Sequence, residues 1–151
     1  MLSSSSLLES AAQSTAFPLF LSFRPPPGVF SSRTFILLNN CDHPVWPVIW
    51  SSLSSQLPAS GFVLQTDQSK IINVPSNSYG RFWGRTDCAQ NQSTGEFSCV
   101  TGDCGTGKLD CAGNIGKPPA TLAEFSLNVS SGLDFYDVSL VDGYCFFCFL
   151  R

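Results

Sequence analysis

One segment, residues 95–111, restricts the fold of this chain more than any other. It places three cysteines in a polar, glycine-rich stretch that has no helical period. Ordering a backbone costs roughly 1 to 2 kcal/mol per residue, and the few apolar residues of this segment cannot offset that cost, so covalent bonds must hold it. Together with Cys88, the spacing of these cysteines predicts two short local bridges, Cys88 with Cys99 and Cys104 with Cys111.

The cysteine content and the charge limit the class of protein. Seven cysteines at close spacing favour an oxidising compartment, and their odd number means that they cannot all pair within one chain. Only 13% of the residues are charged, the net charge is -3, and Lys and Arg form no cluster, unlike in binders of nucleic acid or anionic membranes. No apolar run approaches the roughly 20 residues that span a bilayer. We expect a monomer with no nucleic-acid partner and no transmembrane segment.

Composition divides the chain into three parts. Residues 1–33 are Ser-rich and end in a run of prolines, which indicates a leader or a disordered segment. This leader is a poor signal peptide, because Pro18 interrupts its apolar stretch and the first basic residue, Arg24, comes after that stretch. Residues 34–144 carry short apolar or alternating runs separated by turn residues, which predict an antiparallel all-β sandwich or barrel. Residues 145–151 form a divergent apolar tail. The expected strands are 34–38, 45–50, 61–64, 71–74, 81–85, 122–129 and 135–141.

Two motifs match known spacings but lack the rest of the pattern. Residues 102–108 have the glycine and lysine spacing of a phosphate-binding loop, but Leu109 stands where that loop needs a hydroxyl. Cys145 and Cys148 have the spacing of a redox or zinc pair, but His43 is the single histidine, and four other cysteines are better explained as bridges. The sequence therefore predicts no nucleotide, no metal and no other cofactor.

Acidic residues are the main candidates for chemistry. Glu124, Asp134, Asp137 and Asp142 fall within nineteen residues of a chain that is otherwise poor in charge. Apolar and polar side chains alternate over 123–129, so Glu124 is expected to point away from the hydrophobic face. Positions 137 and 142 differ in parity, so a turn or bulge must lie near Asp142 if both acids share a face. From the pattern alone, these acids fit either solvated strand and turn residues or a ligand site.

Aromatic and basic residues on the expected strands also have two interpretations each. Trp46, Trp50 and Trp83 could stack on sugar rings, but tryptophans on strands more often belong to the core, and we expect core positions. Arg85 alternates with Arg81 along one strand face, which fits either a second ligand-site residue or an ordinary surface cation.

The cysteine-rich segment also resembles a known signature. The spacing Gly-x-Phe-x-Cys-x-Thr-Gly-Asp-Cys-x-x-Gly-x-x-x-Cys over 95–111 resembles that of the plant thaumatin-like proteins, pathogenesis-related group 5. The resemblance covers about 34–144 and implies an antiparallel thaumatin-like β-sandwich with disulfide-stapled loops. In complete relatives a second, cysteine-rich subdomain follows. This chain has no counterpart to that subdomain, so we expect a product shortened at its C-terminus or an imperfect gene model. Further matching stretches lie at 39–41, 82–88, 116–125 and 131–144.

The resemblance implies a ligand site. Thaumatin-like defence proteins carry an acidic cleft lined by one arginine, one glutamate and three aspartates. The matching residues of this sequence are Arg81, Glu124, Asp137 and Asp142. The last aspartate belongs to the subdomain that has no counterpart here.

The resemblance also bears on the remaining cysteines. In relatives, the cysteine that matches Cys41 bonds to one near the far C-terminus. Cys41, Cys145 and Cys148 are therefore expected to be unpaired or of uncertain pairing. Either tail cysteine could take up Cys41 as a substitute partner.

The function that the resemblance implies is plant defence against fungi and stress, by a protein secreted to the apoplast or directed to the vacuole. Its partners would be β-1,3-glucan or other components of the fungal cell wall or membrane. Because carboxylates accept hydrogen bonds from sugar hydroxyls, the first hypothesis is a glucan-binding cleft. The second is a weak endo-β-1,3-glucanase with Glu124 as the acid and Asp142 as its partner. The third is a shortened product without activity. We favour binding over catalysis.

Overall fold

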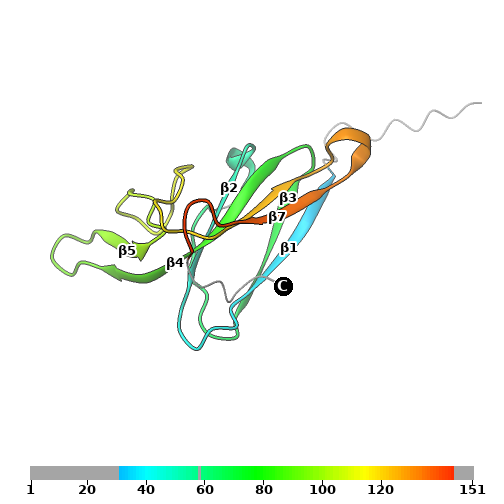
Figure 1. The fold of residues 1–151 in the computed structure, drawn as a ribbon. Helices are drawn as coiled ribbons and strands as arrows, with labels where there is room; N and C mark the ends of the chain where they lie inside the picture. The colour runs from blue at the N-terminus through cyan, green and yellow to red at the C-terminus, as the bar shows by residue number, and fades with distance from the viewer. Residues whose placement is uncertain (1–30, 58, 145–151) are drawn as a thin grey trace, which may run out of the picture.

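The computed structural model describes residues 31–57 and 59–144, which form two antiparallel β-sheets packed face to face (Figure 1). In this part of the chain the helices are two short 3-10 turns. The predicted all-β sandwich is therefore confirmed. Its elements in chain order are β1 (Ser32–Leu38), β2 (Trp46–Ser51), η1 (Ser54–Gln56), β3 (Ser69–Pro75), β4 (Tyr79–Gln90), β5 (Phe97–Thr101), β6 (Leu122–Ser126), η2 (Ser130–Gly132) and β7 (Phe135–Ser139).

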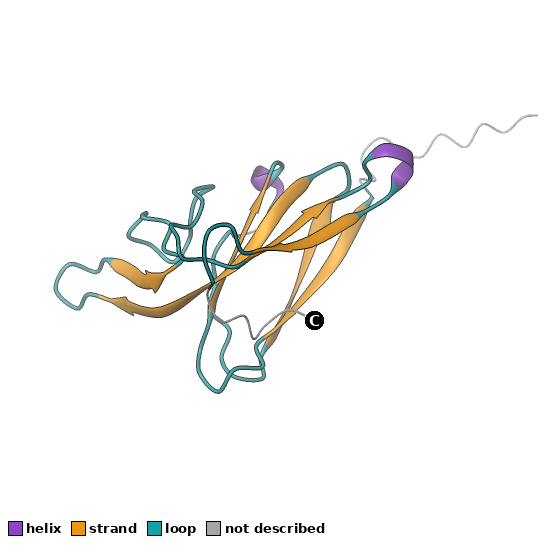
Figure 2. Ribbon diagram, in the orientation of Figure 1, coloured by secondary structure: helices purple, strands orange, loops and turns teal. Residues whose placement is uncertain are grey.

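The two sheets differ in size. The smaller sheet pairs β1 with β3, and the larger sheet has the strand order β2-β4-β6-β7. The first half of the long strand β4 pairs with β2 and β6. Its second half extends beyond the sandwich and pairs with β5 alone (Figure 2). Strand β5 and the loops after it therefore form a lobe that projects from one end of the larger sheet.

The main core lies between the two sheets. Leu37 and Ile72 from the smaller sheet and Phe82 and Phe125 from the larger sheet are buried there. The ring of Phe35 lies against this cluster, with its centroid 5.0 Å from that of Phe82 and 5.1 Å from that of Phe125. Because side chains alternate along a strand, the sequence neighbours of these residues point to the opposite face of their sheet.

A second core lies on the outer face of the larger sheet, beneath the stapled loop. Trp83 is fully buried in it, and its indole N–H donates a hydrogen bond of 2.8 Å to the carbonyl of Gly102. The expectation that Trp83 belongs to the core is therefore confirmed. The buried residues of this second core are Val48, Trp83, Cys104, Cys111, Ala120 and Leu122.

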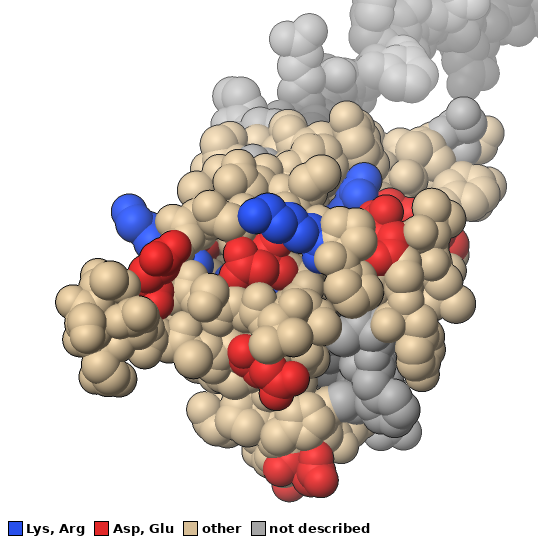
Figure 3. All heavy atoms as spheres, turned by 60° about the vertical axis from the view of Figure 1, so that its left-hand side comes forward, with Lys and Arg blue, Asp and Glu red and all other residues tan. Residues whose placement is uncertain are grey.

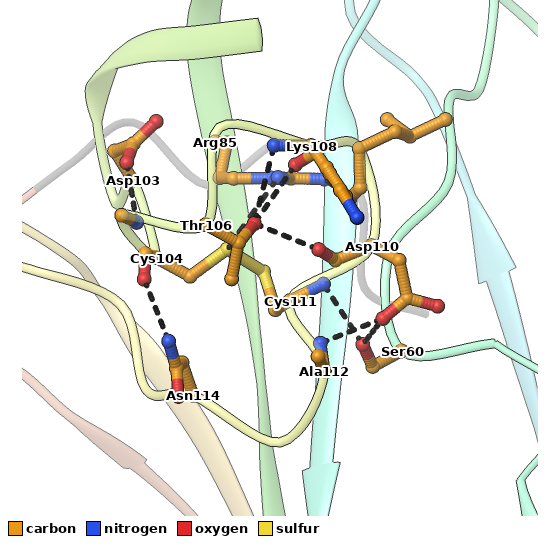
Figure 4. Close-up of a disulfide and its surroundings, with 12 residues drawn as sticks. Ser60, Arg85, Asp103, Cys104, Thr106, Lys108, Asp110, Cys111, Ala112 and Asn114 are labelled. Carbon is orange, nitrogen blue, oxygen red and sulfur yellow. Dashed lines mark hydrogen bonds between the residues drawn. A yellow bond between two sulfur atoms is a disulfide. The ribbon is translucent and has the colours of Figure 1, made fainter. Parts of the chain in front are cut away.

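Both local disulfides that the spacing predicts are present. Cys88–Cys99 joins register partners on β4 and β5. Cys104–Cys111 closes the loop that follows β5 (Figure 4). Cys41 is also disulfide-bonded, so of the two expectations for it the unpaired state is excluded, and pairing with a partner that the sequence leaves uncertain remains. Cys41 is buried beside the inter-sheet core.

Arg85 holds the stapled loop against the sheet. Its Nη2 donates a hydrogen bond of 2.8 Å to the carbonyl of Leu109, and its Nε donates one of 3.2 Å to the carbonyl of Trp46. The guanidinium lies 5.2 Å from the ring centroid of Phe97. Burial lowers the pKa of Arg85 to about 10. Arg85 is thus neither a ligand-site residue nor a surface cation, because the loop covers this part of the sheet (Figure 4).

Most of the expected strands differ from the observed ones by one to three residues at their ends, and β4 runs over Tyr79–Gln90 where 81–85 was expected. Strand β1 begins at Ser32, two residues earlier than expected. Strand β5 was not expected. It is short, and it pairs with β4 at the Cys88–Cys99 disulfide. Residues 61–64 form only two isolated bridges. Strand β6 ends at Ser126 because Asn128 adopts a φ of 52°, which breaks the extended chain.

Several expectations concern residues that the structure does not describe. Residues 1–30, 58 and 145–151 are not described, so most of the expected leader, the tail, Cys145 and Cys148 lie outside. Within the described part, no helix has the length and apolar content that a membrane crossing requires. The described residues also contain no group of three or more His, Cys, Asp or Glu side chains suited to a metal ion.

Candidate functional site

The strand register brings three of the four expected cleft residues into one line across the larger sheet. Arg81 on β4 is the partner of Glu124 on β6, which is the partner of Asp137 on β7. On its other side, Arg81 is the partner of Trp50 on β2. Direct partners point to the same face, with Cβ atoms about 4.5 to 5.5 Å apart. We term Arg81, Glu124 and Asp137 the charged row, and Trp50 lies at its end.

The charged row lies on the outer face of the larger sheet. Phe82 and Phe125 follow Arg81 and Glu124 in the sequence and are buried between the sheets. Alternation along each strand therefore directs the charged side chains outward. Figure 3 shows a face of the molecule on which acidic and basic side chains lie side by side.

The contacts within the row are loose. Arg81 Nε lies 3.7 Å from Glu124 Oε1, and the two side chains are 31% and 33% exposed. The guanidinium also lies 5.8 Å from the ring centroid of Trp50. Ion pairs at this exposure contribute about 0 to 1 kcal/mol. Asp137 adds a second carboxylate directly across from the first, and like charges in that position destabilise a sheet. The row is therefore poorly explained as a stabilising feature.

A hollow of about 230 Å³ opens beside the charged row. One wall carries the carboxylates of the row, and the other carries aromatic rings. Such a hollow can exchange hydrogen bonds with hydroxyl groups while contacting an apolar ring. Its lining residues are Trp50, Tyr79, Gly80, Arg81, Glu124, Phe125, Ser126 and Asp137.

Asp142, the fourth expected cleft residue, lies apart from the row. It sits in a turn after β7 in which Gly143 N–H donates a 3.1 Å hydrogen bond to the carbonyl of Leu140. This is the turn that the parity of positions 137 and 142 requires. The carbonyl of Asp142 accepts a 3.1 Å hydrogen bond from Ala120 N–H. Ala120 precedes Glu124 by four residues, a distance of about 13 Å along an extended chain. A shared role of Asp142 with that glutamate stays a prediction.

Asp134, the remaining acid of the cluster, has structural partners. Its Oδ2 accepts a 2.6 Å hydrogen bond from Arg33 Nε, and its Oδ1 accepts one of 2.8 Å from the backbone N–H of Asn128. The hydrogen bond from Arg33 lowers the pKa of Asp134. Asp134 thus ties β1 to the segment between β6 and β7, with its side chain 19% exposed and paired with Arg33.

Sequence reasoning missed the aromatic wall of the hollow. Tyr79 was not singled out, and Trp50 was considered for stacking on sugar rings but expected in the core. Tyr79 is 58% exposed and Trp50 is half-buried, with their ring centroids 5.9 Å apart. A signal did exist, because Tyr79 and Arg81 are two residues apart on one strand and so share a face. Trp46 is likewise half-buried, elsewhere on β2.

Known proteins match most of this chain. A family model described as the Thaumatin family matches residues 39–148. A PR5-like receptor kinase of Arabidopsis thaliana is 49% identical over 114 residues, which is 75% of this chain and 17% of that protein. Thaumatin-like protein 1 of Castanea sativa is 48% identical over 114 residues, 75% of this chain and 46% of that protein. A glucan endo-1,3-beta-glucosidase of Prunus avium is 46% identical, with the same two coverages. The chain thus spans less than half the length of each of these three relatives.

A solved structure agrees with these matches. The structure of a thaumatin-like xylanase inhibitor has a TM-score of 0.56 and 33% sequence identity, covering 72% of this chain and 68% of that chain. The antiparallel sandwich therefore has a counterpart in a solved protein. Since the family model extends over most of the sequence, this chain belongs to the thaumatin family.

Proposed function

We propose that this chain binds fungal cell-wall β-1,3-glucan through the charged row, as part of a secreted plant defence protein that acts in the apoplast or the vacuole. The observation that carries the proposal is the line of Arg81, Glu124 and Asp137 on three paired strands beside a hollow. Membership of the thaumatin family and the plant relatives support the defence role.

The chemistry of the row suits a polymer of sugar rings. Glu124 and Asp137 offer carboxylate oxygens that accept hydrogen bonds from neighbouring hydroxyls. Arg81 offers N–H groups that donate to hydroxyl or ring oxygens. Hydrogen bonds to charged groups contribute about 1.5 to 3 kcal/mol each, which is roughly a factor of ten or more in affinity. A few such bonds per sugar unit, repeated along a polymer, give useful retention on an insoluble wall.

A pull-down on insoluble β-1,3-glucan tests the proposal. Glu124→Gln and Asp137→Asn remove one charge each and keep the shape of the side chain, and both should lower retention. Asp87→Asn is the matched control, because Asp87 is exposed on the far half of β4, about 20 Å along the strand from Arg81. Equal retention of all these proteins would discard the proposal.

A second candidate function is hydrolysis of the same polymer. Two observations favour it: Glu124 and Asp137 are direct cross-strand partners, and one relative is named a glucan endo-1,3-beta-glucosidase. Glycosidases hold their two carboxyl groups about 5 to 5.5 Å apart in retaining enzymes and about 6.5 to 9.5 Å apart in inverting ones. Partners on adjacent strands can reach the shorter separation. By family analogy, Glu124 would be the acid and Asp142 its partner, whereas the strand register makes Asp137 the nearer candidate for the second role.

Release of reducing sugar from β-1,3-glucan separates hydrolysis from binding. Glu124→Gln should abolish the release if the chain is a glucanase. Asp137→Asn and Asp142→Asn, measured side by side, then identify the second carboxylate by the greater loss. No release by the unchanged protein would leave binding as the function.

A further inference from the structure

Two aromatic rings stand beside the charged row, and one of them packs against the edge of the second core. Tyr79 is 58% exposed, and Trp50 is half-buried at the edge of the second core. Their ring centroids are 5.9 Å apart and their planes are tilted by 52°. Large aromatic rings open to solvent side by side are unusual on a polar face and commonly mark a contact surface.

The backbone holds both rings in place. Tyr79 N–H donates a 3.2 Å hydrogen bond to Oγ of Ser52, and the carbonyl of Tyr79 accepts one of 2.9 Å from Ser52 N–H. Gly80 lets the two strands approach closely, since a Cβ there would lie 2.3 Å from the carbonyl oxygen of Trp50. On the other side of Trp50, the guanidinium of Arg81 lies 5.8 Å from the ring centroid. A ligand therefore meets rings on rigid strands, which reduces the entropy lost on binding.

A third exposed aromatic ring lies on the same face of the larger sheet, in a row of register partners beside the charged row. Tyr79 is the partner of Ser126, which is the partner of Phe135 on β7. These three positions form a second row next to the charged row and on the same face. Phe135 is 55% exposed. Carboxylates thus lie in one row, with aromatic rings at the end of that row and along its side.

This combination matches the two chemical sides of a β-linked glucose unit. Its hydroxyl groups are equatorial and lie around the edge of the ring, where carboxylates can accept their hydrogen bonds. Its ring faces carry only C–H bonds and are apolar, so they pack against flat aromatic surfaces. Tyrosine and tryptophan suit such a site because they combine a large apolar face with a polar group.

We propose that Trp50 and Tyr79 form a stacking subsite that takes one pyranose ring of a β-1,3-glucan, next to the unit whose hydroxyls bind the charged row. This inference rests on the proposed glucan-binding function and names a further part of its site. The two aromatic residues then select sugars whose ring faces are flat and apolar, and the carboxylates orient the hydroxyl groups of these sugars.

The experiment titrates the whole chain with soluble β-1,3-gluco-oligosaccharides by calorimetry and by tryptophan fluorescence. Tyr79→Ala should weaken binding about tenfold, since losing roughly 50 Å² of apolar contact corresponds to about one decade of affinity. Tyr79→Phe keeps the ring and should bind as the unchanged protein does. Trp50→Phe should remove the fluorescence change on binding, because Trp83 is fully buried and Trp46 lies about 13 Å along β2 from Trp50. Tyr136→Ala is the matched control, since Tyr136 is also 58% exposed but lies on the opposite face of β7.

The outcomes separate the two proposals. If Glu124→Gln weakens binding while Tyr79→Ala does not, the stacking subsite is overturned and the charged row stands. If Tyr79→Ala weakens binding and Glu124→Gln does not, the subsite stands and the role of the row is overturned. Equal weakening by Tyr79→Ala and Tyr136→Ala would also overturn the subsite. An unchanged protein that binds no β-1,3-gluco-oligosaccharide would overturn both.

Discussion

Asp137→Asn is expected to stabilise this protein while weakening its binding to glucan. Glu124 and Asp137 are direct partners on β6 and β7, so two negative side chains face each other at a short distance. Asparagine keeps the shape of aspartate and removes the repulsion. The same carboxylate is proposed to accept a hydrogen bond from the ligand, so binding should fall. Opposite effects on stability and binding are expected for a residue kept for function.

The size of the gain follows from the separation and from the solvent. Two unit charges about 5 Å apart in water repel by about 0.8 kcal/mol. Water is the appropriate medium, because Asp137 is exposed and the Glu124 side chain is 33% exposed. Salt screens the repulsion over about 30 Å at 0.01 M, about 8 Å at 0.15 M and about 3 Å at 1 M. The free energy of unfolding should therefore rise by about 0.7, 0.4 and 0.2 kcal/mol at these three concentrations.

Urea unfolding followed by tryptophan fluorescence measures this gain at the three salt concentrations. The unchanged protein, Asp137→Asn and Asp87→Asn are compared in parallel. Asp87 has a φ of 51°, which asparagine adopts as readily as aspartate, so the control removes the same charge without backbone strain. Retention on insoluble β-1,3-glucan is measured on the same preparations.

Two results would refute the electrostatic reasoning: a loss of stability in Asp137→Asn at low salt, or a gain that does not shrink as salt is added. An equal gain in Asp87→Asn would show that net charge, rather than the cross-strand pair, causes the effect. A gain in stability with unchanged retention would support the cross-strand repulsion but show that Asp137 does not belong to the proposed glucan site.

Three further predictions concern the scaffold. Gly80→Ala should lower the free energy of unfolding in urea by about 1 to 3 kcal/mol, because its Cβ would lie 2.3 Å from the carbonyl oxygen of Trp50; an unchanged midpoint would contradict this. Because the hydrogen bond from Arg33 lowers the pKa of Asp134, this pair stabilises the fold above about pH 4, and the contribution is lost as the pH falls through the lowered pKa. Asp134→Asn should flatten that part of the acid dependence of the urea midpoint. Thiol counting on the unreduced protein should find fewer than three free thiols, because Cys41 is disulfide-bonded in addition to the two local pairs.

The sequence determined the local features of this protein, because these depend on residues close together in the chain. The bridges Cys88–Cys99 and Cys104–Cys111 span sequence separations of only 11 and 7, so spacing alone identified the partners. Alternating apolar residues likewise predicted a sheet with one buried face. Strand β5 escaped prediction because its residues show no strong alternation, and it forms where a disulfide and the far half of β4 bring it into register.

The resemblance named the candidate site residues, but only the tertiary structure decided which of them lie side by side. Arg81 lies far from Glu124 and Asp137 in the sequence and meets them because Phe82 and Phe125 must be buried between the sheets, which determines the register of β4 and β6. A slip of one residue would turn every side chain of a strand to the other face. The same register placed Asp142 beyond the row and Trp50 beside Tyr79, and the packing of the stapled loop buried Arg85. Long-range pairing of this kind depends on the packing of the whole sandwich, and short patterns along the chain do not contain it.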